Sequence, residues 1–300
     1  MGRKRQKRLA LNPKHQELSE AILAEDIDKV RALIDEGVDP SEFWSFFPCP
    51  MEAAKQVNNV EIAKLLLSVG TPIYVNESEE MVDAQELDFI WLYAKWHKSS
   101  HDVVMLMLEH AESVNNPNSS YNPLVHMTSI EDKDIGPESD AFFAKIVEMG
   151  ADPDLPEIDD EGHETGETML HWAVLGDNKY VTPIIELAKN IDACSDDQPD
   201  QTPLRIAVSH ASVNAVKALI GKGANPNIYK KKRKLHKSYS LLDLAKEYYE
   251  DTQNKAFQEK KAAKYKQIVE FLEEAGAKTF KQMVFDGDIP EIPPKEEWID

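Results

Sequence analysis

Residues 202–207 read Thr-Pro-Leu-Arg-Ile-Ala, and residues 213–227 read Val-Asn-Ala-Val-Lys-Ala-Leu-Ile-Gly-Lys-Gly-Ala-Asn-Pro-Asn. Thr202 can cap a helix, and Pro203 fits the first helical turn, where a backbone N–H has no partner. Gly223 suits the left-handed residue that commonly ends a helix. The segment therefore predicts a helix, a tight turn, a second helix and a stop.

The same design recurs along the chain. A small or medium-sized residue lies three positions after a large apolar one, and successive copies of this pair are 33 to 46 residues apart. Residues at i and i+3 face one side of a helix, so each pair marks a helix with one apolar face. Because one helix pair buries only one face, each unit depends on its neighbours for stability. The small residues of the seven units are Ala21, Ala54, Ala94, Met127, Ala173, Ala207 and Ala245.

Three stretches resemble the ankyrin-repeat family, whose consensus is about 33 residues long. They are the segment at 202–227, Thr-Met-Leu-His-Trp-Ala at 168–173, and Gly-Ala-Asp-Pro-Asp at 150–154, which is similar to the family's Gly-Ala-Asp ending. The resemblance implies an all-α fold, an ankyrin-repeat solenoid of stacked helix-turn-helix units with projecting β-hairpin-like fingers. It also implies that His171 is a structural residue that forms hydrogen bonds between fingers, and not a catalytic base.

The resemblance covers roughly residues 13–279 and divides the chain into three parts. We expect a basic N-terminal tail at 1–12, an ankyrin-repeat domain at 13–279 and an acidic, proline-containing C-terminal tail at 280–300. The tail cannot continue a helix through its prolines, so it either packs along the last repeat or serves as a linear motif for another protein. The units are expected at about 13–40, 41–73, 80–115, 116–154, 159–194, 195–227 and 228–279.

Two units are longer than the others between their helices. In the seventh unit, residues 246–264 contain no Gly or Pro and are rich in Glu, Lys, Ala and Gln, which favours an extension of both helices. In the fourth unit, Gly136 and Pro137 lie between Met127 and Phe143, and we expect a loop there.

Composition and charge limit the classes of function. The 300 residues include 34 Lys and Arg against 54 Asp and Glu, and the formal charge of −20 argues against nucleic acid as the main partner. No run of 18 apolar residues exists, so no membrane span is expected, and the N-terminal segment lacks the apolar core of an export signal. The two cysteines, 145 positions apart, indicate a reducing compartment, so we expect an intracellular, cytoplasmic location. We also expect the protein to be monomeric. The basic runs at Arg3–Arg8 and Lys230–Lys237 leave a nuclear location open, and a secreted effector also stays open.

The sequence contains no recognisable catalytic pattern, and we expect no enzyme activity, cofactor or metal. It lacks a Gly-rich phosphate loop, a Gly-x-Ser-x-Gly elbow and a His-Glu-x-x-His motif. His97 and His101 have a spacing that could share a metal, but the Lys-Ser-Ser sequence between them is more typical of a turn. Cys49 and Cys194 are expected to be buried fillers of the core.

Two of the predicted fingers carry opposite charge. Residues 154–167 hold seven carboxylates, and Lys230–Lys237 holds six Lys or Arg residues. These fingers form either a polarised binding edge that orients a partner, or solvated loop tips. The four aromatic rings at 43–47 belong either to the core or to an exposed anchor for a partner.

We therefore expect a non-catalytic protein–protein interaction scaffold or adaptor, which binds a protein partner of unknown identity through its fingers and concave helix face. Two alternatives stay open: a pathogen or symbiont effector that captures a host protein, and a nuclear or chromatin-associated regulator that uses the basic segments. The resemblance implies contacts at finger tips and at the end of each first helix. The candidate partner-binding residues are Glu161, His163, Glu164, Glu167, Gln198, Gln201, Ser209, His210, Lys231, Lys232 and Arg233.

Overall fold

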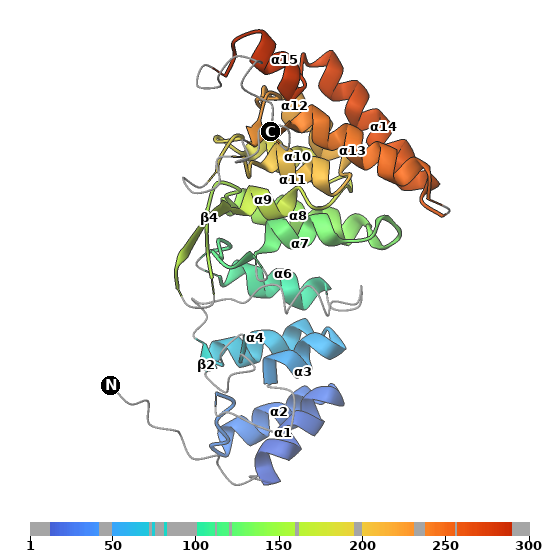
Figure 1. Ribbon diagram of the computed structural model, residues 1–300. Coiled ribbons are helices and arrows are strands. Elements are labelled where there is room, and N and C mark those ends of the chain that lie inside the picture. The colour runs from blue at the N-terminus through green and yellow to red at the C-terminus, as the bar shows by residue number, and fades with distance from the viewer. Residues whose placement is uncertain are drawn as a thin grey trace. The chain divides into compact units, whose positions relative to one another are not determined.

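The predicted all-α fold of helix-turn-helix units with short β-hairpins is confirmed (Figure 1). The chain divides into two compact units, and each is described by itself. Unit 1 contains Met1–Asn116, Tyr121–Pro123 and Gly136–Ala151, and unit 2 contains Pro117–Ser120, Leu124–Ile135 and Asp152–Asp300. The computed structural model describes residues 13–41, 50–71, 74–75, 81–82, 101–111, 113–119, 122–159, 162–194, 200–230, 238–255 and 257–289.

Unit 1 is built from helices that stack in chain order. Its elements are α1 (Pro13–Leu23), α2 (Ile27–Asp35), α3 (Pro50–Val57), α4 (Val60–Ser68), the paired antiparallel strands β1 (Tyr74–Val75) and β2 (Met81–Val82), α6 (His101–Glu109) and α8 (Pro137–Glu148). Helix α1 contacts α2 and α3, α3 contacts α4, and α6 contacts α4 and α8. Their facing sides bury a continuous apolar layer, which includes Leu18, Ile22, Met51, Ile62 and Leu66.

Local sequence signals begin and end the helices of unit 1. The side chain of Asp26 accepts a hydrogen bond from the Lys29 backbone nitrogen at the start of α2, and Asn59 does the same for Ile62 at the start of α4. After α2, Gly37 has a φ of +90°, the left-handed conformation predicted for a glycine that ends a helix.

In its described residues, unit 2 contains helix pairs and the paired strands of two hairpins. Its helices are α7 (Pro123–Ser129, from its second residue), the 3-10 helix η3 (Asp132–Asp134), α9 (Met169–Ala173), α10 (Val181–Leu187), α11 (Pro203–Ser209), α12 (Val213–Gly221), α13 (Leu241–Gln253), α14 (Glu259–Glu274) and α15 (Phe280–Phe285). Strand β3 (Pro156–Ile158) pairs with β4 (Glu164–Thr168), and β5 (Tyr229–Lys230) pairs with β6 (Tyr239–Ser240), both antiparallel. The hairpins are the predicted fingers.

The segment at 202–227 folds as predicted. The side chain of Thr202 accepts a hydrogen bond from the Arg205 backbone nitrogen, and Pro203 occupies the first position of α11. Gly223 follows α12 with a φ of +97°. The capping, start and stop signals of this repeat therefore act as their sequence indicates, because each depends on neighbours only a few residues away.

Aspartates near the ends of the repeats connect one repeat to the next. The two side-chain oxygens of Asp154 accept hydrogen bonds from the backbone nitrogens of Lys189 and Asn190, at 2.6 and 3.1 Å. In the following repeat, Asp192 accepts one from the Asn225 nitrogen at 3.1 Å. These carboxylates satisfy loop N–H groups that have no partner within their own helix.

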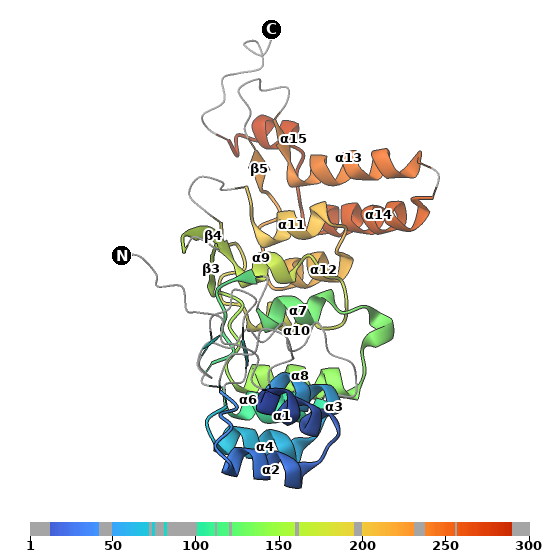
Figure 2. The same ribbon diagram turned by 90° about the horizontal axis from the view of Figure 1, so that it is seen from below.

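The seventh repeat has the predicted extension of both helices. Helices α13 and α14 have 13 and 16 residues, whereas α11 and α12 have 7 and 9. The two long helices contact each other and run past the ends of α11 and α12 (Figure 2). Phe257 lies between them, is fully exposed and has a φ of +69°.

The expected loop between Met127 and Phe143 needs a correction. Helix α8 already begins at Pro137, so only residues 130–136 connect α7 to α8, and they include the short helix η3. Proline is favoured at the first helical position, because its missing N–H needs no partner there and its φ is already helical. The Gly-Pro pair thus marks a helix start and not the middle of a loop.

The first part of the expected C-terminal tail, residues 280–289, contains a helix and packed side chains. Helix α15 starts with a capping box between Thr279 and Gln282. The side chains of Phe280, Met283 and Ile289 form a small buried cluster. Several other segments singled out in the sequence lie outside the described residues: 1–12, the rings at 43–47, Cys49, His97 and 290–300.

Candidate functional site

The β3–β4 hairpin is the acidic finger that the sequence predicts. Its turn contains two hydrogen bonds of 2.9 Å, from the Asp159 nitrogen to the His163 carbonyl oxygen and from the His163 nitrogen to the Asp159 carboxylate. His163 and Glu164 are exposed, and Glu167 is half-buried. The hairpin thus presents two candidate residues to solvent on a turn with defined hydrogen bonds.

Glu157 lies on the same hairpin, but only 7% of its surface is exposed. Its carboxylate accepts hydrogen bonds from Ser119 Oγ at 2.5 Å and from Thr165 Oγ1 at 2.9 Å. Burial raises the pKa of the Glu167 carboxyl, and the charge of Glu157 raises it further. Glu157 therefore ties the hairpin to the segment before α7, a role that its place in a run of carboxylates did not reveal.

His171 has the structural role that the family resemblance implies. Its Nδ1 accepts a hydrogen bond from the Thr168 backbone nitrogen at 2.9 Å, so Nε2 carries the proton. Nε2 donates to the carbonyl oxygens of Ala193 and Gln201, at 3.0 and 3.2 Å. The ring is 1% exposed, and burial lowers its pKa. A neutral imidazole therefore links α9 to the next finger.

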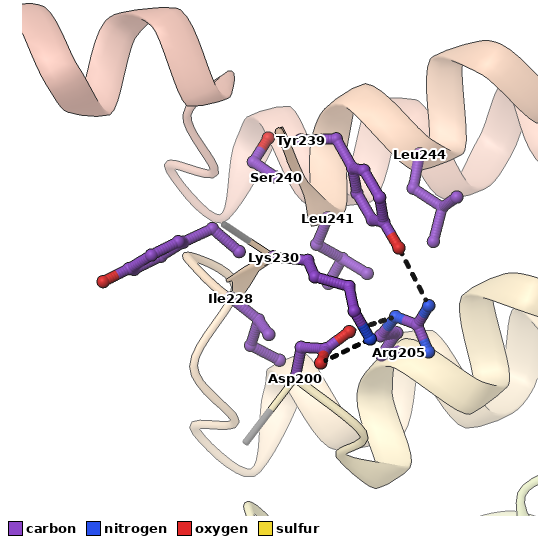
Figure 3. A pocket seen from close by; sticks show the side chains of 9 residues that line it. Asp200, Arg205, Ile228, Lys230, Tyr239, Ser240, Leu241 and Leu244 are labelled. Carbon is purple, nitrogen blue, oxygen red and sulfur yellow. Dashed lines mark hydrogen bonds and ion pairs between the residues drawn. The ribbon is translucent and has the colours of Figure 1, made fainter. Parts of the chain in front are cut away.

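A cluster of charged side chains lies at the base of the β5–β6 finger (Figure 3). The Asp200 carboxylate forms an ion pair with Lys230 Nζ at 3.0 Å and another with Arg205 Nε at 3.3 Å. Arg205 also donates to the Gln201 side chain and, at 3.2 Å, to the Tyr239 hydroxyl. Asp200 is 5% exposed, and its charge is stabilised by these two cations.

These side chains line a shallow pocket whose remaining walls are apolar or small: Ile228, Tyr229, Ser240, Leu241 and Leu244. Figure 3 shows the side chains of Lys230 and Arg205 converging on Asp200, with the Tyr239 hydroxyl directed at Arg205. No space inside the pocket admits a water-sized sphere. A ligand would therefore lie over this pocket and not within it.

Ser209 and His210, at the end of α11, have different surroundings. The Ser209 carbonyl oxygen accepts a hydrogen bond from the Tyr265 hydroxyl of α14 at 2.9 Å, and the residue is half-buried. His210 is exposed and donates from Nδ1 to the Ile206 carbonyl oxygen at 3.0 Å. The long helix α14 thus covers part of the surface where the family resemblance placed a contact.

The structure does not bring all the predicted site residues together. Cys194 is exposed, which corrects its prediction as a buried filler, because the loop after α10 keeps it outside the helix packing. Three residues of these sites were missed in the sequence: Glu157, Asp200 and Tyr239. One signal was available, because Arg205 occupies the position of its repeat that His171 occupies in the preceding one, and an arginine there indicates a nearby carboxylate. The candidates outside the described residues are Glu161, Gln198, Lys231, Lys232 and Arg233.

The described ranges contain neither a metal-binding cluster nor a membrane-spanning helix. No group of three or more His, Cys, Asp or Glu side chains there could hold a metal ion. None of the helices in those ranges is long and apolar enough to cross a membrane.

Comparison with known proteins agrees with the repeat architecture. Residues 140–230 match the family described as ankyrin repeats (3 copies). No curated protein sequence matches the chain. Among solved structures, the chain is similar to an ankyrin repeat domain from Acinetobacter baumannii, with 16% identity, 87% of this chain and 98% of that chain covered, and a TM-score of 0.41.

Two further solved structures are similar at the same level. The human ASB11 ankyrin repeat domain has 18% identity and a TM-score of 0.45, with 86% of this chain and 96% of that chain covered. An ankyrin repeat protein from Leishmania major has 16% identity and a TM-score of 0.39, with 88% and 98% covered. The family match, which coincides with the best-defined of the periodic units, shows that residues 140–230 of this chain contain ankyrin repeats.

Proposed function

We propose that this chain is a non-catalytic scaffold or adaptor, and that the outer side of the β3–β4 finger is its contact surface for a protein partner. Ankyrin repeats are generally protein–protein interaction modules. The observation that carries the proposal is the division of the finger into an anchored inner side and an exposed outer side.

The inner side of the finger is held by buried polar contacts. Glu157 is bound by two hydroxyl groups, and the His171 ring joins Thr168, at the end of β4, to the following repeat. The outer side carries His163 and Glu164, which are exposed. Because hydrogen bonds already hold the described backbone of the finger, residues 156–159 and 162–168, these residues would lose little conformational entropy when a partner binds.

The chemistry of the finger favours a partner with a basic surface. Glu164 and the half-buried Glu167 present carboxylates, and the whole chain has a formal charge of −20. Opposite charges across an interface steer association and fix orientation, whereas the phosphates of a nucleic acid would be repelled. We propose a monomeric, intracellular protein whose partner contributes Lys or Arg to this contact.

The experiment compares the full chain with the double variant Glu164→Lys/Glu167→Lys as bait, with quantitative mass spectrometry of the retained proteins. The matched control, Glu250→Lys/Glu274→Lys, makes the same charge change at exposed positions of α13 and α14. We expect the finger variant to lose a basic partner at least about tenfold, a coupling of about 1.4 kcal/mol or more, while the control keeps it. Equal retention by both variants would overturn the proposal.

A further inference from the structure

The pocket at the base of the β5–β6 finger has an excess of positive charge. Arg205 and Lys230 face the single carboxylate of Asp200. The Lys230 side chain is 29% exposed and has three N–H donors, one of which binds Asp200. Among the described residues, Lys230 is therefore placed to bind a second anion that lies over the pocket.

Exposed apolar surface adjoins this pocket and leads to the end of the described chain. Tyr229, next to Lys230, is 37% exposed, and its ring centroid is 6.0 Å from that of Phe280. Phe280 belongs to the buried cluster that contains Ile289. Phe285, on the same helix as Phe280, is 90% exposed. A continuous series of contacts thus connects Ile289 to the pocket.

The eleven residues that follow Ile289 have a composition that complements this surface. They read Pro-Glu-Ile-Pro-Pro-Lys-Glu-Glu-Trp-Ile-Asp, with four carboxylates against one lysine, a side-chain charge of −3. Ile292, Trp298 and Ile299 supply apolar side chains. A fully extended chain of this length spans about 36 to 40 Å, and the contacts from Ile289 through Phe280 to Tyr229 lead to the residue next to Lys230.

We propose that the acidic segment 290–300 docks on its own chain, with a carboxylate on Lys230 over the pocket and an apolar side chain against Tyr229 or Phe285. Attachment at Ile289 gives the segment an effective concentration of about millimolar, so weak contacts suffice. The three prolines reduce the entropy that the segment loses on binding. The docked segment would compete with any acidic peptide for this pocket, and this self-contact does not depend on the finger proposed above as the partner surface.

The test uses fluorine NMR of the full chain labelled with 5-fluorotryptophan. The chain has five tryptophans, and the Trp298→Phe variant identifies the resonance of Trp298. A labelled synthetic peptide of residues 290–300 supplies the undocked reference position. We expect the Trp298 resonance of the full chain to lie away from this reference, and its position to be the same after tenfold dilution.

Variants locate the contact. Lys230→Gln should move the Trp298 resonance most of the way to the peptide position, and Lys266→Gln, an exposed lysine of α14, should leave it in place. The Trp172 resonance, from α9, reports whether the repeats remain folded. Should Lys230→Gln disturb Trp172, the tail variant Glu291→Lys/Glu296→Lys, which leaves the repeats unchanged, is expected to move Trp298 alone. The proposal would be overturned if the Trp298 resonance of the unmodified chain lay at the peptide position, or if neither charge variant moved it. A resonance position that changes on dilution would assign the contact to a second copy of the chain, which would also overturn the proposal.

Discussion

The Asp243 carboxylate accepts a hydrogen bond at 2.7 Å from the backbone nitrogen of Phe280, which lies 37 residues further along the chain. The same carboxylate oxygen accepts bonds from the nitrogen and the hydroxyl of Ser240, and so caps α13. Asp243 therefore starts its own helix and holds α15 against the seventh repeat.

Equivalent positions in the two preceding repeats make the same kind of connection with different chemistry. His171 donates to the Gln201 carbonyl oxygen of the next repeat, and Arg205 donates to the Tyr239 hydroxyl of the repeat after that. The same position in three repeats, occupied by His171, Arg205 and Asp243, thus connects the first helix of the repeat to the segment that follows it. The connecting groups are an imidazole, a guanidinium and a carboxylate. Because single repeats cannot fold alone, these contacts are expected to contribute strongly to stability.

Replacement of His171 by Ala should destabilise the protein by about 2 to 4 kcal/mol. The variant leaves the Thr168 nitrogen and two carbonyl oxygens without their partner in a buried site, and each unsatisfied group costs about 1 to 3 kcal/mol before water replaces it. Urea unfolding measures the change. His210→Ala, at an exposed histidine, serves as control and should change stability by less than about 0.5 kcal/mol. Equal effects at the two positions would contradict the structural role of His171.

Asp200→Asn should cost about 3 kcal/mol, because Arg205 and Lys230 then lose the carboxylate that compensates their charge in a largely buried cluster. The comparison is Glu273→Gln, which breaks the exposed ion pair with Lys246 and should cost less than about 1 kcal/mol. Denaturant unfolding at low and high salt measures both, and the Asp200 effect should be the less sensitive to salt. A small, fully screened effect at Asp200 would show that the cluster is solvated.

Gly176→Ala should destabilise the protein by more than about 2 kcal/mol. A Cβ atom at this position would lie 2.1 Å from the carbonyl oxygen of Thr128, in the last turn of α7, so one of the two backbones must move. Gly221→Ala provides a matched change of opposite sign, since a Cβ there meets nothing within 4 Å and the residue is helical. It should stabilise by about 0.5 kcal/mol. Thermal unfolding of the two variants checks the difference in sign.

The stability of the protein should fall between pH 6.5 and pH 4 through His126. Burial lowers the pKa of this histidine from its usual 6.5 to about 4. Below pH 6.5 the unfolded chain binds a proton that the folded chain does not, so the free energy of unfolding decreases by up to about 1.4 kcal/mol per pH unit until the folded pKa is passed. Since the side chain keeps some contact with solvent, we expect a total loss of about 2 to 3 kcal/mol.

The measurement is urea unfolding of the unmodified chain and of His126→Gln at several pH values from 7 to 4. The glutamine variant cannot bind the proton, so the difference in stability between the two chains should shrink as the pH falls. Parallel curves would show that His126 titrates normally in the folded protein.

Phe257→Gly should stabilise the protein, although it removes a large side chain. Phe257 has a left-handed backbone, which costs a residue with a Cβ about 1 to 2 kcal/mol, and its fully exposed ring offers no packing in return. We expect a gain of about 1 kcal/mol after the larger entropy of the unfolded glycine chain is subtracted. Phe285→Gly, at the exposed last residue of α15, should instead lose up to about 1 kcal/mol of helix propensity. Calorimetric melting temperatures that change in the same direction would contradict this assignment.

Much of the fold could be predicted from local patterns. Thr202, Pro203 and Gly223 act on a helix through atoms of the same few residues, and the absence of Gly and Pro over 246–264 was sufficient to predict the long helices α13 and α14. The extent of the loop before α8 was overestimated because Gly-Pro is compatible both with a turn and with a helix start, and only the neighbouring apolar residues of α8 decide between them.

The candidate site was less accessible to prediction. In the sequence, Glu157 cannot be distinguished from the six other carboxylates of the acidic finger. In the structure it is buried and binds the hydroxyl of Ser119, which is 38 residues away. Asp200 and Arg205 are only five residues apart, but Lys230 comes from the following repeat, so the three side chains meet only when two repeats are stacked.

By itself, the sequence determined the helix caps and the all-α repeat fold, because hydrophobic periodicity and capping are properties of neighbouring residues. Only the tertiary structure decided which charged residues are buried, that Cys194 is exposed and that Phe280 and Ile289 pack beside the last finger. The physical reason is that burial and charge compensation depend on side chains from different repeats, about thirty residues or more apart in the sequence. A local sequence pattern does not indicate which of these side chains come into contact.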